Sequence, residues 1–131
     1  MQSIGVFFVF IFLSLNVQAL EIGIVSGSLD LNVPGNSSVY VQFSLLEVQS
    51  DESKVIVAQQ PFVKTEQNKI PFTINYNAQN INPERHYKLA VIVASDSKGK
   101  SILGQHDFPI ITHGKPTELN IAIDIAPEPI E

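Results

Sequence analysis

The chain has 131 residues, of which 44% are hydrophobic and 16% charged, and its formal net charge is −5. That length suits one domain, or two at most. The sequence contains no cysteine, which excludes a disulfide scaffold, a thiolate metal site and a cysteine nucleophile. The acidic balance argues against a nucleic-acid-binding protein, because neutralising phosphates requires clustered lysine and arginine side chains.

The first segment is expected to be a secretory signal peptide. Residues 4–15 form a nearly unbroken apolar run of 12 residues, which is shorter than the about 20 residues that span a bilayer. Val17 and Ala19 then fit the pattern that signal peptidase accepts before a cleavage site. We expect residues 1–19 to be removed and residues 20–131 to form a mature domain that is periplasmic or secreted. An uncleaved anchor or a buried strand is the alternative.

The rest of the chain has a hydrophobic period of two, which predicts β-strands rather than helices. Strands are expected, in chain order, at residues 21–31, 38–48, 55–60, 70–76, 87–95, 101–108 and 117–125. The segment 87–95 is apolar on both faces, which predicts a central strand. Pro71 cannot donate a hydrogen bond to a neighbouring strand, so its strand is a candidate sheet edge, as is the segment 55–60.

Turn-forming residues separate these strands. Residues 33–36 (VPGN) favour a type II turn, and Gly99 is expected to be left-handed within a hairpin loop. Residues 113–116 (HGKP) predict another turn, and the asparagine-rich residues 75–83 predict a loop. A helix is expected at most as a single turn near residues 83–86. Seven short strands joined in this way predict an all-β fold, an antiparallel β-sandwich with a short acidic C-terminal tail.

The order of these motifs resembles that of a family of small periplasmic β-sandwich proteins. The family comprises YbaY-like lipoproteins and YscW-type pilotins, which are lipoprotein chaperones of type III secretion. The resemblance covers residues 25–125. The matching segments are 25–31 (VSGSLDL), 38–48 (SVYVQFSLLEV), 57–60 (VAQQ), 70–76 (IPFTINY), 81–87 (INPERHY) and 111–116 (ITHGKP).

The resemblance implies a protein-binding module of the cell envelope that has no catalytic residues and no cofactor. For the pilotin branch it implies a chaperone, whose groove holds an apolar segment of an outer-membrane secretin or another envelope protein. Many members carry a cysteine at the cleavage point, where an acyl anchor is attached. Here Leu20 follows the expected signal peptide and no cysteine is present, so we expect no lipid anchor.

Aromatic side chains on a strand surface are typical of peptide or glycan capture. The candidate binding residues are therefore Tyr40, Phe62, Tyr76 and Phe108, and packing in the core or at its rim is the alternative for each of them. If they formed one platform, a glycan-binding envelope protein would be a second reading of the sequence. A purely structural envelope domain is a third.

The sequence offers little for catalysis. Its histidines are His86, His106 and His113, and a metal-dependent enzyme would use the last two. Asp107 follows His106, but neighbouring residues of a strand point to opposite faces. Residues 23–27 (GIVSG) do not have the spacing of a hydrolase nucleophile elbow, which is G-x-S-x-G. We therefore expect no enzyme activity and no metal site.

Overall fold

The computed structural model describes residues 21–33 and 38–125. The strands are β1 (Ile22–Asn32), β2 (Val39–Val48), β3 (Lys54–Gln59), β4 (Val63–Thr65), β5 (Lys69–Asn77), β6 (His86–Ala94), β7 (Ile102–Ile110) and β8 (Glu118–Asp124). A single 3-10 turn, η1 (Ala78–Asn80), follows β5. Within these ranges, no helix has the length and apolar character needed to cross a membrane.

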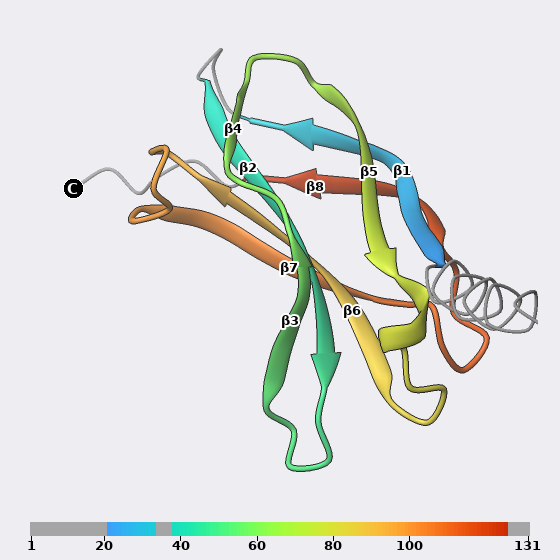
Figure 1. The fold of residues 1–131 in the computed structure, drawn as a ribbon. Coiled ribbons are helices and arrows are strands. Elements are labelled where there is room, and N and C mark those ends of the chain that lie inside the picture. Colours follow the sequence, from blue (N-terminus) through green and yellow to red (C-terminus); the bar gives the residue numbers. More distant parts are fainter. Residues whose placement is uncertain (1–20, 34–37, 126–131) are drawn as a thin grey trace, which may run out of the picture.

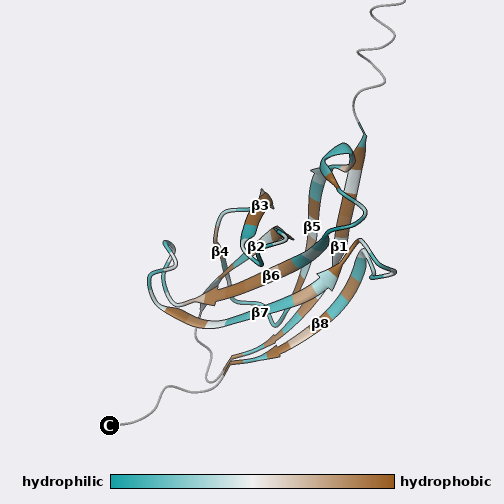
Figure 2. Cartoon of the chain, turned by 90° about the horizontal axis from the view of Figure 1, so that it is seen from below, coloured by the Kyte–Doolittle hydropathy of each residue, from teal (hydrophilic) through white to brown (hydrophobic). Residues whose placement is uncertain are grey.

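The strands form two sheets that pack face to face (Figures 1 and 2). Sheet A has the order β5-β1-β8, and sheet B has the order β3-β2-β6-β7, with β4 also pairing with β2. The prediction of an all-β sandwich is confirmed. The expected seven strands become eight, because the three-residue strand β4 lies between two expected strands.

One pairing departs from the expected antiparallel arrangement, because β1 and β8 pair in parallel. Gly27 of β1 lies opposite Leu119 of β8 in this pairing. Its φ is 154°, and a Cβ placed there would lie 1.7 Å from the carbonyl oxygen of Leu119. Only glycine allows the two backbones to approach so closely.

The core lies between the two sheets and is built by the expected alternation of apolar residues. The side chains that are fully buried there include Val25 and Leu29 from sheet A and Leu45, Leu89 and Val91 from sheet B. Strand β6 lies between β2 and β7 and is apolar over most of its length (Figure 2), so the prediction of a central strand is confirmed. The expected edges are also confirmed, because β5 ends sheet A and β3 ends sheet B.

Most of the expected turns are present. Gly99 has a φ of 72° and Gly114 has a φ of 77°. The single helical turn lies at Ala78–Asn80 instead of residues 83–86, because the side chain of Asn77 caps it by accepting a hydrogen bond from the Gln79 N–H at 3.0 Å. The expected signal peptide, most of the 33–36 turn and the acidic tail lie outside the described residues.

Candidate functional site

An apolar groove opens between the edge strands of the two sheets, where β4 of sheet B faces β5 of sheet A. Its volume is about 270 Å³. The residues that line it are Val41, Phe43, Gln60, Val63, Thr65, Ile70, Pro71, Phe72 and Thr73. None of these side chains is ionisable, so the groove suits an apolar guest and offers no group for acid–base chemistry.

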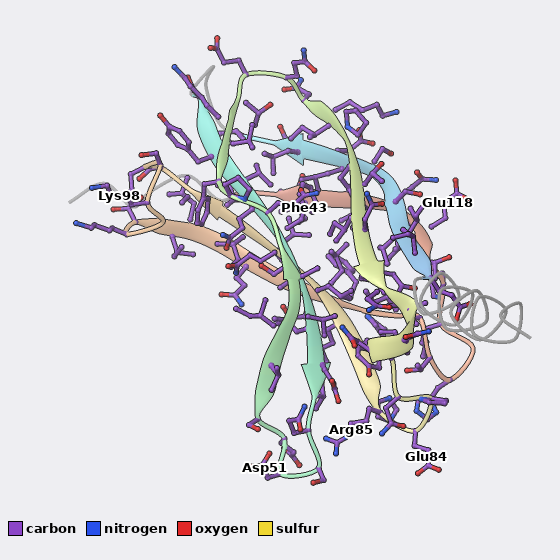
Figure 3. All side chains as sticks on the ribbon, in the orientation of Figure 1. Phe43, Asp51, Glu84, Arg85, Lys98 and Glu118 are labelled. Carbon is purple, nitrogen blue, oxygen red and sulfur yellow. The ribbon has the colours of Figure 1, made fainter. Side chains whose placement is uncertain are left out.

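Two aromatic rings from opposite sheets form the floor of this groove. Phe43 of β2 and Phe72 of β5 stack with ring centroids 4.6 Å apart and planes at 21°. Both are nearly buried, and Phe43 points into the space between the sheets (Figure 3). Each ring occupies an inward position in its strand's alternation, but the sequence could not show that the two would meet.

The rim of the groove lies where the edge of sheet B is interrupted between β3 and β4. Strands β3 and β4 are separated by residues 60–62, and Gln60 turns its side chain across to sheet A. Its Nε2 donates a hydrogen bond of 2.6 Å to the backbone carbonyl of Thr73. Next to this hydrogen bond, Val63 lies at the opening of the groove with 59% of its surface exposed. An exposed apolar residue beside an apolar cavity is a natural contact for a partner.

The four aromatic residues singled out in the sequence do not gather at one place. Tyr76 and Phe108 are partly buried and pack against the core. Tyr40 is half-buried on β2, opposite Ala94. The ring of Phe62 lies against Gly99 in the β6–β7 loop, where a Cβ would be 2.7 Å from the ring.

The histidines show one unexpected contact. His86 and His113 stack with ring centroids 4.1 Å apart and planes at 18°, whereas His106 lies on the edge strand β7, opposite Val91. In residues 21–33 and 38–125, no group of three or more histidine, aspartate or glutamate side chains could hold a metal ion.

The loops around this histidine pair are tied together by polar contacts. Arg85 forms an ion pair with Glu47 at 3.5 Å and donates a hydrogen bond of 2.8 Å to Gln49. The hydroxyl of Thr112 donates a bond of 2.6 Å to the backbone carbonyl of Arg85. These contacts hold the β7–β8 loop and the β2–β3 hairpin against the start of β6.

Among the residues that the structure describes, two ionisable groups have shifted pKa values, and neither is in the groove. Hydrogen bonds from the side chain and the backbone of Ser53 lower the pKa of Asp51, which lies at the tip of the β2–β3 hairpin (Figure 3). Burial raises the pKa of the Tyr76 hydroxyl, which covers Gly23. Both shifts have structural causes of an ordinary kind and do not indicate a reactive centre.

Comparison with known proteins identifies the family. The model of the YscW family, described as the type III secretion system lipoprotein chaperone, matches residues 22–123. The chain belongs to this family. The match includes all of β1 to β7 and nearly all of β8, so the resemblance inferred from the sequence motifs is confirmed.

A solved structure shares the fold of this YscW family member. It is an alternative pilotin from the type II secretion system of Vibrio cholerae, with a TM-score of 0.63 and 17% sequence identity. The alignment covers 82% of this chain and 100% of that one. No curated protein sequence matches the chain.

Proposed function

We propose that this protein is a non-catalytic chaperone of the cell envelope, of the pilotin kind, which binds an apolar segment of a secretin in the groove between β4 and β5. The observation that carries the proposal is the groove itself, which is apolar, free of ionisable side chains and open at the edge of the sandwich. Membership of the YscW family supports a role in a secretion system.

The size of the groove limits what it binds. A volume of about 270 Å³ is smaller than the usual drug-sized pocket and accommodates one or two apolar side chains. Burying each such side chain contributes about 1.5–3 kcal/mol. The partner segment therefore needs one or two apolar anchors on Phe43 and Phe72, and further contacts around the exposed Val63.

The first 19 residues would bring the protein to the envelope. The apolar residues 4–15 would direct export, and cleavage after Ala19 would release a mature protein that begins at Leu20. Because the sequence contains no cysteine, the mature protein would act without an acyl anchor at its start. It would hold its partner in the periplasm as a soluble complex.

A matched pair of variants tests the groove. The full chain with a C-terminal tag is expressed in its own host and recovered from a detergent extract of the envelope, and the bound proteins are identified by mass spectrometry. Val63→Asp places a charge at the groove, whereas Val55→Asp places one on a similarly exposed valine of β3 that does not line it.

We expect the unmodified chain and Val55→Asp to recover a secretin subunit, and Val63→Asp to lose it. Recovery of a secretin by all three proteins would move the binding site away from the groove. Recovery of no secretion-system protein by the unmodified chain would contradict the proposed function.

A further inference from the structure

The outer face of sheet B, which points away from the core, is unlike an ordinary solvent-exposed sheet face. Leu46 of β2, Ile56 of β3 and Ile92 of β6 all lie on it, and Ile56 is 55% exposed. Between them lie small residues, Ser44 and Ala90, which are buried although no second sheet among the described residues covers this side. An apolar sheet face without a covering layer is a candidate contact surface.

Lysines lie around these apolar residues on the outer face of sheet B. Strand register places Lys54 opposite Val48, Lys64 opposite Tyr40 and Lys88 opposite Leu46, all on the outer face of sheet B. Among the described residues, Asp107 is the one carboxylate in these strands that shares the face. Three lysines and one aspartate give this face a formal charge of +2 in a chain whose net charge is −5.

The outer face of sheet A has the opposite sign. Asp30, Glu118 and Asp124 lie there with Lys69, which pairs with Asp30 at 4.0 Å. Three carboxylates and one lysine give it a formal charge of −2. The two outer faces of the sandwich therefore attract different partners.

An ion pair crosses the outer face of sheet B. Lys54 on β3 and Asp107 on β7 are separated by β2 and β6, which in a flat sheet puts their strands about 14 Å apart. Their side chains nevertheless meet at 3.3 Å across the face. A lysine of this face is therefore already engaged by a carboxylate.

We propose that the outer face of sheet B docks an acidic amphipathic segment of a protein partner. The apolar side chains of the segment would contact Leu46, Ile56 and Ile92, and its carboxylates would pair with Lys54 and Lys88. The Lys54–Asp107 ion pair crosses the same face, and the Oδ1 atom of Asp107 is buried without a hydrogen-bond partner among the described residues. A partner carboxylate would compete with Asp107 for Lys54.

This surface is separate from the groove, so the inference extends beyond the proposed function. Strand β4 contributes to both, but Val63 and Thr65 point to the groove, whereas Lys64 points to the outer face. Along β2, Tyr40 and Val48 are eight residues apart, about 26 Å. A helix of 18 residues has nearly the same length.

The probe is therefore an 18-residue peptide of leucine and glutamate with amphipathic spacing, and its control has lysine at every glutamate position. Binding to the full chain is measured by calorimetry at two salt concentrations and mapped by amide chemical shifts. The double variant Lys54→Gln, Lys88→Gln removes charge from the face, and Lys69→Gln removes a lysine from sheet A as the matched control. Asp107→Asn frees Lys54.

We expect the glutamate peptide to bind and to shift amides of β2 and β6, with weaker binding at high salt. The double variant should weaken binding about five-fold, since two exposed ion pairs are lost. Lys69→Gln should leave it unchanged, and Asp107→Asn should strengthen it. Equal binding of the lysine peptide, an unaffected double variant, or shifts limited to β4 and β5 would overturn the inference.

Two further outcomes would also overturn it. Binding to vesicles of anionic phospholipid, lost in the double variant, would assign the face to a membrane. Concentration-dependent self-association that the double variant abolishes would assign it to a second copy of the chain. Loss of the secretin by Val63→Asp, together with unchanged binding of the glutamate peptide by the double variant, would overturn the inference about this face and leave the proposed function standing.

Discussion

Replacing Gly27 with alanine tests the parallel pairing of β1 and β8 most sharply. The new Cβ would lie 1.7 Å from the carbonyl oxygen of Leu119, and contacts below 3.0 Å are essentially never seen for a real Cβ. The two backbones would have to separate by more than an ångström. The φ of 154° is also one that only glycine adopts without cost.

The expected loss of stability in Gly27→Ala can be worked out from the contacts that keep β8 beside β1. Backbone strain alone costs about 1–3 kcal/mol. If β8 moves away from β1, it also exposes part of Ile121 and Ile123, and full burial of each contributes about 1.5–3 kcal/mol. We therefore expect Gly27→Ala to reduce the free energy of unfolding by about 2–6 kcal/mol. For a domain of this size, that lowers Tm by about 10 °C or more.

Gly114→Ala is the matched control for this experiment. Gly114 also has a positive φ, 77°, but a Cβ there would meet nothing within 4 Å. Its cost is backbone strain alone, about 1–2 kcal/mol. Urea denaturation followed by circular dichroism measures both variants. A loss for Gly27→Ala that does not exceed the loss for Gly114→Ala would refute the close approach of the two strands.

Three further predictions concern single polar groups. Ser53→Ala should raise the pKa of Asp51 toward 3.8, as measured by carboxyl NMR. It should also reduce stability at neutral pH but not in acid, because a carboxyl group with a lowered pKa stabilises the fold only while it is ionised. Tyr76→Phe should reduce the loss of Tm above pH 10, because the raised pKa of Tyr76 stabilises the fold only below the ordinary value of 10.0; an identical loss in both proteins would contradict this. Thr112→Val should cost about 1–2 kcal/mol in urea denaturation, because it removes the bond to the carbonyl of Arg85, and Thr112→Ser should restore most of that stability.

The sequence predicted the strands well because each carries its own alternation of apolar residues. All seven expected strands agree with observed strands to within about two residues at each end, and both expected edges are correct. The short strand β4 was missed because it has only three residues, Val63–Thr65, which are too few to show an alternation of apolar and polar positions. The parallel partner of β1 was also missed, since strand pairing across about 90 residues leaves no local pattern.

The candidate site was harder to predict for the same reason. Phe43 and Phe72 were visible as inward residues of two strands, but their stacking depends on how the two sheets face each other. Gln60 looked like an ordinary strand end, and its bond to Thr73 appears only in three dimensions. The chosen aromatics Tyr76 and Phe108 pack against the core instead, because alternation does not show how much of a half-buried ring remains exposed.

We propose above that a secretin segment occupies the groove between β4 and β5. The most direct test is photo-crosslinking in living cells, with a benzophenone amino acid at position 63 and, as the control, at position 55. Both positions are exposed, and only Val63 lines the groove. We predict a crosslinked adduct that contains a secretin subunit from position 63 and none from position 55. No secretin adduct from position 63, or equal adducts from both positions, would contradict binding of the secretin in this groove.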